Sequence, residues 1–150
     1  RLSHLMRYML YSNSDNKITM GNEIEFLNSY MEIQKLRFGE LDITTTIDVI
    51  NPEIRIVPML LIPLLENAYK HGTGTVEEPQ IKIVLATSSS GVLQFTVTNR
   101  FNIASNASTE PKGIGLQNVR KRLGYLYEDK HELTILEDDD VFTTNLTLKL

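Results

Sequence analysis

The chain has 150 residues with a formal net charge of -4 at pH 7, and 41% of its residues are hydrophobic. These values are typical of one globular domain, and the lack of excess positive charge argues against nucleic acid as the main partner. It contains no cysteine, which excludes disulfides and thiolate metal sites. No apolar run reaches the ~18 residues of a membrane-spanning helix, so we expect no direct membrane contact. Because the sequence starts at Arg1 within a helical pattern, we expect a fragment, and any targeting or membrane segment would lie upstream.

The first third of the chain predicts two helices and one strand. Apolar residues at helical spacing predict the last turns of a helix over residues 2–11, followed by a polar loop. A second helix is expected from about residue 22 to Gly39, a residue type that often ends helices. Alternating apolar and polar residues over 41–50 predict a half-buried strand. The charged residues of the second helix are expected to face solvent: Glu23, Glu25, Glu32 and Lys35.

The middle of the chain predicts an apolar helix over 57–72 and then a β-hairpin. Pro58 suits the first position of a helix, whereas Pro63 would remove a backbone hydrogen bond within one. The regular helix therefore either begins near Pro63 or is kinked there. The hairpin is expected to join strands 81–86 and 93–99.

A polar loop over 101–112 leads to a helix over 115–127 and a second hairpin with strands 133–135 and 142–150. This order of elements predicts a two-layer α/β sandwich, in which helices cover one face of a mixed, mostly antiparallel sheet. The face of the last helix that is expected to be buried consists of Leu116, Val119, Leu123 and Leu126. The residues expected off this face are Arg120, Lys121 and Arg122.

The helix over 57–72 carries polar residues that could bind a ligand. Asn67, Lys70 and His71 are spaced by three and four positions and share one helix face. An asparagine carbonyl oxygen can ligate Mg²⁺, and a lysine can pair with phosphate. Alternatively, the residues form the solvent-exposed end of a helix, where positive charge is favourable. Glu66 is a lesser candidate for orienting the waters of the metal.

Two further features could belong to the same site. Gly113 and Gly115 flank Ile114 at the start of a helix and precede Leu116, so free backbone N–H groups there could bind an anion. A lone pair of glycines is also common in ordinary turns. The loop over 101–112 has the length and composition of a lid.

Asn99 is in phase with Leu93, Phe95 and Val97, so its side chain is expected on the apolar side of its strand. There its amide could bind an adenine edge, or it could cap the following loop. His4 and His131 are expected to be an ordinary helix residue and a surface residue.

Residues 63–72 (Pro-Leu-Leu-Glu-Asn-Ala-Tyr-Lys-His-Gly) and 113–123 (Gly-Ile-Gly-Leu-Gln-Asn-Val-Arg-Lys-Arg-Leu) resemble the N box and G2 box of the GHKL (Bergerat) ATPases, which include gyrase, Hsp90, histidine kinases and MutL. Residues 2–8 and 30–39 are similar to two further runs of the LytS/YehU-type sensor histidine kinases. The four blocks occur in the family order. The resemblance to this family therefore covers nearly the whole chain.

The resemblance implies an ATP and Mg²⁺ site. Asn67 would ligate Mg²⁺, Lys70 and His71 would line the phosphate and ribose side, and the run from Gly113 to Leu116 would hold the phosphates under the lid. The phospho-acceptor histidine of the family lies upstream of the run that 2–8 resembles, so His4 would not be the acceptor. The chain would therefore contain no catalytic residue of its own.

The resemblance also implies domains and partners. Residues 1–18 would end the dimerisation and phospho-acceptor region, and residues 19–150 would form the ATP-binding domain. A full-length protein would form a homodimer and phosphorylate a response regulator. The chain would be a cytoplasmic part of a membrane-anchored sensor kinase.

One run departs from the family pattern. GHKL proteins usually carry an adenine-binding aspartate in a D-x-G-x-G box, whereas residues 97–101 contain Asn99 and no glycine. The amide oxygen of Asn99 would accept a hydrogen bond more weakly than a carboxylate. An alternative is therefore a degenerate domain that acts as a non-catalytic dimerisation or partner-binding module. An ATP-hydrolysing switch ranks last, because Pro63 stands where a general-base carboxylate would precede Asn67 by one turn.

Overall fold

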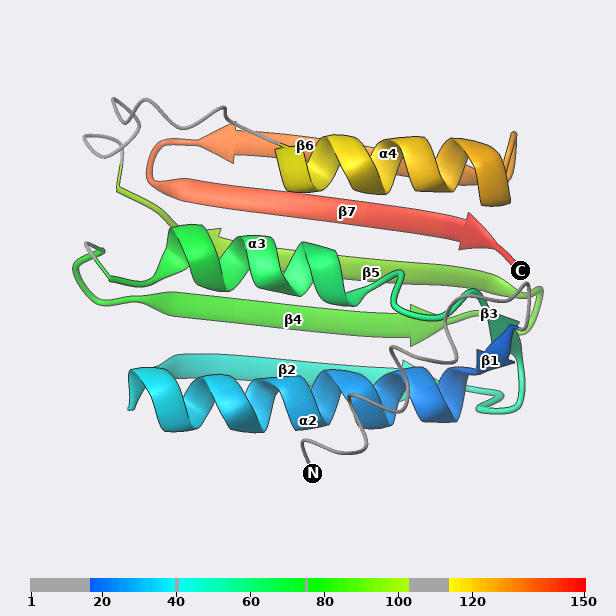
Figure 1. Ribbon diagram of the computed structural model, residues 1–150, viewed down its shortest axis with the longest axis horizontal. Coiled ribbons are helices and arrows are strands. Elements are labelled where there is room, and N and C mark those ends of the chain that lie inside the picture. Colours follow the sequence, from blue (N-terminus) through cyan, green and yellow to red (C-terminus); the bar gives the residue numbers. More distant parts are fainter. Residues whose placement is uncertain (1–16, 40, 75, 103–113) are drawn as a thin grey trace.

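The computed structural model describes residues 17–39, 41–74, 76–102 and 114–150, and within them three helices lie on one face of a five-stranded sheet (Figure 1). The elements, in chain order, are β1 (Ile18–Thr19), α2 (Met20–Phe38), β2 (Asp42–Val49), β3 (Arg55–Ile56), α3 (Ile62–Gly72), β4 (Gln80–Thr87), β5 (Val92–Arg100), α4 (Ile114–Leu126), β6 (His131–Asp138) and β7 (Val141–Lys149). The expected helix over 2–11, His4, Gly113 and most of the expected lid lie outside the described residues.

The main sheet has the strand order β2-β4-β5-β7-β6. β2 is parallel to β4, and the other neighbouring pairs are antiparallel. The predicted fold class, a two-layer sandwich with a mixed and mostly antiparallel sheet, is therefore confirmed. Both predicted hairpins are present, and the turn of the first ends at Gly91, whose φ of 78° lies in the left-handed region that favours glycine.

The core lies between the sheet and the helices because the strands alternate. On β4 and β5, Ile81, Ile83, Phe95 and Val97 are buried, whereas the residues between them are more exposed. The opposite face of the sheet is polar, as the hydrogen bond from the Thr96 hydroxyl to the Asn145 side chain illustrates. This face is not covered by any of the described helices (Figure 1).

The α2 helix ends at Gly39 as predicted, but it begins at Met20, about two residues before the expected start. The Thr19 side chain accepts a hydrogen bond from the Asn22 N–H, and Gly39 ends the helix with a φ of 70°. The prediction that Glu23 faces solvent is wrong, because this residue is fully buried. The expectation of a half-buried strand over 41–50 is only partly met, since β2 is an edge strand and even Ile47 remains exposed.

The α3 helix begins at Ile62, so Pro58 does not occupy the first helical position. Pro63 lies in the first turn, where a missing N–H breaks no helical hydrogen bond. Of the two alternatives for Pro63, the start of the helix near this residue is therefore correct. The short strands β1 and β3, which pair antiparallel through Ile18 and Ile56, were not predicted.

The α4 helix and the second hairpin also occur as predicted. The burial of individual residues differs from the prediction at the end of α4 and at the start of β6. Leu126 is 42% exposed, and Tyr127, the residue after the helix, is buried instead. His131 is partly buried rather than on the open surface, and its Nδ1 lies 2.6 Å from the carbonyl oxygen of Tyr127.

Candidate functional site

The second half of α3 carries the three polar residues that the sequence singles out. Leu64, Leu65 and Ala68 bury the other side of the helix. Asn67 is partly buried, whereas Lys70 and His71 are exposed. The helix therefore holds an amide, an ammonium group and an imidazole at its surface, on a backbone that core packing fixes.

The end of α3 packs directly against Asn99 on β5. A methyl group added at Gly72 would lie 2.9 Å from the Asn99 Cβ, 3.1 Å from its Nδ2 and 3.2 Å from its Cγ. Only glycine permits this approach without movement of the helix or the strand. The structure therefore brings the last residue of the 63–72 block against the residue that stands in the adenine-box position.

Asn99 is 1% exposed and points to the helix side of the sheet, as its phase with Phe95 and Val97 predicts. Its Nδ2 donates to the carbonyl oxygen of Arg100 at 2.8 Å. Its Oδ1 has no hydrogen-bond partner among the described residues. A buried amide oxygen without a partner is costly, so this atom is suited to accept from a donor such as the amino group of adenine.

The first turn of α4 is the third part of the candidate site. Gly115 is exposed, and a methyl group added to it would contact nothing among the described residues within 4 Å. The Leu116 side chain is buried in the core, so only its backbone could face an anion. Ile114 begins the helix, while Gly113 lies outside the described residues. The role of this turn in phosphate binding stays a prediction.

Aromatic residues join α2 to α3 beside these positions. The ring of Tyr69 packs edge-on against Tyr30 and is stacked on Phe38. Burial raises the pKa of Tyr69 to about 12, and its hydroxyl has no hydrogen-bond partner among the described residues. Burial, with a smaller contribution from the charge of Glu66, raises the pKa of Tyr30 to about 12. Burial also raises the pKa of Glu66, the lesser candidate for orienting metal-bound water.

Sequence reasoning missed two polar residues that hold the chain before α3. The Glu23 carboxylate accepts from backbone amides just before that helix, and Arg122, which was expected off the buried face of α4, donates to backbone carbonyls there. Glu23 lies three residues after Met20 and four before Leu27, both fully buried or nearly so. This helical spacing was the signal that could have placed Glu23 on the buried face.

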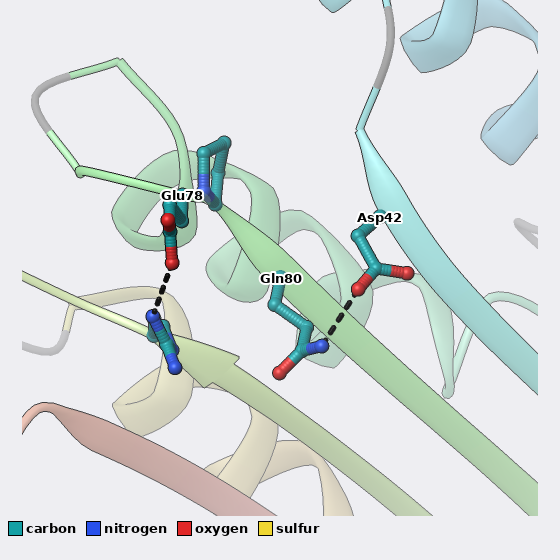
Figure 2. A pocket seen from close by; sticks show the side chains of 5 residues that line it. Asp42, Glu78 and Gln80 are labelled. Carbon is teal, nitrogen blue, oxygen red and sulfur yellow. Dashed lines mark hydrogen bonds and ion pairs between the residues drawn. The ribbon is translucent and has the colours of Figure 1, made fainter.

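A shallow pocket of 360 Å³ lies elsewhere, on the face of the sheet that the helices do not cover (Figure 2). Its side chains already bind one another: Gln80 Nε2 donates to Asp42 Oδ2 at 2.7 Å, and Arg100 lies 3.5 Å from Glu78. It contains none of the predicted nucleotide-binding residues. We therefore do not assign the candidate site to this pocket.

Comparisons with known proteins find sensor histidine kinases among the proteins that are similar to this chain. A family profile described as "Histidine kinase" matches residues 1–41. Sensor histidine kinase BtsS of Escherichia coli (strain K12) is 27% identical over 134 residues, which cover 89% of this chain and 24% of BtsS. Sensor protein LytS of Oceanobacillus iheyensis is 28% identical over 155 residues, with 93% of this chain and 26% of LytS covered. Over most of its length, the chain is therefore similar in sequence to sensor histidine kinases.

The fold of the chain is that of histidine kinase catalytic domains. The solved catalytic domain of histidine kinase ThkA matches with a TM-score of 0.59 and 15% identity, covering 89% of this chain and 95% of that domain. The predicted LytS-type relationship and the GHKL fold are therefore confirmed. The chain spans about a quarter of the length of these curated sensor kinases. Among the described helices, none is long and apolar enough to cross a membrane.

Proposed function

We propose that this chain is the ATP-binding catalytic domain of a two-component sensor histidine kinase. In this proposal it positions Mg²⁺-ATP so that a histidine on an upstream segment can receive the γ-phosphoryl group. The relatives are sensor kinases, and histidine kinases use ATP, so the family supports this reading over a non-catalytic interaction module.

The observation that carries the proposal is the buried Oδ1 of Asn99, which has no hydrogen-bond partner in the part of the chain that the structure describes. It lies at the end of a central strand, on the helix side of the sheet, and in contact range of the end of α3. The Nδ2 of the same amide is held by the Arg100 carbonyl, so the side chain presents an acceptor rather than a donor. An acceptor at this position suits adenine, whose exocyclic amino group is a donor.

The other residues would each hold a different part of the nucleotide. The Asn67 carbonyl oxygen would ligate Mg²⁺, which completes its octahedral shell with phosphate oxygens and water. Lys70 and His71 would neutralise phosphate charge and contact the ribose side. Backbone N–H groups from Gly113 to Leu116 would bind phosphate at the start of α4. Bound ATP supplies the transferable phosphoryl group, and the chain contributes positioning and charge neutralisation.

The domain boundary and the partners follow from the same proposal. Residues 1–18 would connect to the dimerisation region and residues 19–150 would form the ATP-binding domain, with the boundary falling within β1. The full-length protein would be a homodimer that phosphorylates a response regulator. Because the substrate is ATP, this domain would act on the cytoplasmic side of a membrane-anchored sensor.

Base selectivity tests the proposal directly. Calorimetric titration should detect ATP binding and much weaker GTP binding, because guanine presents a carbonyl oxygen where adenine presents its amino group. Asn99→Ala should lose the ATP binding. Equal affinities for the two nucleotides, together with unchanged ATP binding by folded Asn99→Ala, would contradict the proposal.

A further inference from the structure

The chain just before α3, residues 58–61, is bound from one side by a buried carboxylate of α2. Glu23 is 0% exposed. Its Oε2 accepts from the N–H of Met59 at 3.1 Å, and its Oε1 accepts from the N–H groups of Leu60 and Leu61 at 3.1 and 3.2 Å. Three consecutive backbone N–H groups therefore donate hydrogen bonds to a single side chain from another helix.

The same segment is bound from another side by α4. Arg122 donates from Nη1 to the carbonyl oxygen of Met59 at 2.9 Å and from Nη2 to that of Pro58 at 2.7 Å. The planar guanidinium thus binds two successive carbonyl groups in the forked geometry that arginine favours. Tyr127, the residue just after α4, accepts from the N–H of Val57 at 3.0 Å and extends this contact by one residue.

Backbone strain lies where the two contacts meet. Met59 has a φ of 55°, in the left-handed region that side-chain-bearing residues rarely adopt. Such a conformation persists only when the surrounding structure holds it. Here Glu23 binds the N–H of Met59 and Arg122 binds its carbonyl, so both ends of the strained residue are fixed.

The α3 helix has no side-chain cap at its N-terminus. Leu61 is its N-cap residue, no side chain in that position binds the first turn, and the first turn contains no acidic residue. The position of the helix start is therefore set from outside, by a carboxylate on α2 and a guanidinium on α4. Asn67 lies six residues after this N-cap, on the same short helix.

We propose that Glu23 and Arg122 are positioning residues for Asn67, an inference that rests on the proposed ATP site. By binding residues 58–61 they fix where α3 begins, and so the position from which Asn67 would bind the metal. Arg122 also belongs to the helix whose first turn carries Gly115, so it fixes the Asn67 helix relative to the phosphate-binding turn. Neither Glu23 nor Arg122 needs to touch the nucleotide for this role.

Calorimetry with ATP, in Mg²⁺ and in EDTA, tests the proposal at a temperature where each variant is folded. Arg122→Gln should weaken Mg²⁺-ATP binding about tenfold, the scale on which supporting contacts of a metal site act. Binding in EDTA should change little. Arg122→Lys should fall between, because an ammonium group cannot bind two carbonyls as a planar fork. Lys121→Gln, an exposed neighbour on the same helix, is the matched control and should bind as the unchanged chain does.

A double-mutant cycle distinguishes positioning from general destabilisation. If Arg122 acts through Asn67, Arg122→Gln should add no further loss to Asn67→Ala. Glu23→Gln should show the same Mg²⁺-specific loss, because its amide NH₂ would face the N–H of Met59, donor against donor. Folded Arg122→Gln that binds Mg²⁺-ATP as tightly as the unchanged chain would overturn the inference.

Hydrogen exchange separates this inference from the proposed function. If the unchanged chain binds no ATP, the proposed function fails, and the nucleotide role of Arg122 fails with it. Whether Arg122 holds residues 58–61 in place is then tested without nucleotide. In Arg122→Gln, the amides of Met59, Leu60 and Leu61 should exchange faster than in the unchanged chain. Unchanged exchange at these amides would overturn the positioning role as well.

Discussion

The close packing of Gly72 on Asn99 predicts that Gly72→Ala destabilises the fold. The added Cβ would lie 2.9 Å from the Asn99 Cβ, well inside the 3.5–4.0 Å at which carbon atoms pack best. The Asn99 Cβ is attached to a central strand and cannot rotate away, so α3 and β5 must separate. Gly72 does not have a positive φ, so alanine can adopt its backbone conformation.

The expected size follows from two opposing effects. Overpacking of a filled core typically costs about 1–3 kcal/mol. Replacing a helical glycine by alanine offsets up to about 1 kcal/mol of this cost. We therefore expect Gly72→Ala to lower the free energy of unfolding by about 1–2 kcal/mol, and to weaken ATP binding because it displaces Asn99.

Urea denaturation of two matched variants measures this effect. Gly124 lies within α4, and a methyl group added there would contact nothing among the described residues within 4 Å. Gly124→Ala should therefore raise the free energy of unfolding, by up to about 1 kcal/mol. Stabilisation of Gly72→Ala to the same extent as Gly124→Ala would contradict the close packing of α3 on Asn99.

Three further predictions concern the same region. Tyr69→Phe should raise the free energy of unfolding by about 1 kcal/mol, because it removes a buried hydroxyl that has no hydrogen-bond partner among the described residues. Because the folded-state pKa of Tyr69 is raised to about 12, the unchanged chain should also lose stability between pH 10 and 12, and urea titrations at alkaline pH should show a smaller loss in the variant. Asn99→Asp should destabilise the fold at pH 7 by about 1–3 kcal/mol in the same urea assay, since it places a carboxylate oxygen against the Arg100 carbonyl; equal stability would contradict the bond from Nδ2. Lys70→Gln should weaken binding of ATP but not of adenosine in calorimetry, and equal losses for both ligands would remove Lys70 from the phosphate side.

The arrangement of the elements was predictable because periodicity and turn residues are local signals. The alternation over 81–86 and 93–99 specifies a hairpin with one buried face, and the same phase correctly places Asn99 on that face. The start of α3 could be narrowed to two alternatives, because Pro63 is compatible with a first turn or a kink but not with an undisturbed helix interior.

Contacts between segments that are distant in the sequence could not be predicted from the sequence alone. Glu23 was expected in solvent because a carboxylate is rarely buried, and its partners at 59–61 are backbone amides that no sequence pattern marks. The β1–β3 pair has two residues per strand, which is too short for a periodic signal. The role of Gly72 is likewise visible only once β5 lies against α3.

The central claim is that Asn67 binds the metal of an ATP complex. Calorimetry with ATP in Mg²⁺ and in EDTA, for the unchanged chain and Asn67→Ala, tests it most directly. We predict micromolar to submillimolar binding that is stronger in Mg²⁺, and loss of this Mg²⁺ dependence in the variant. Absence of binding at millimolar ATP by the folded chain, or an unchanged Mg²⁺ dependence in Asn67→Ala, would contradict the claim.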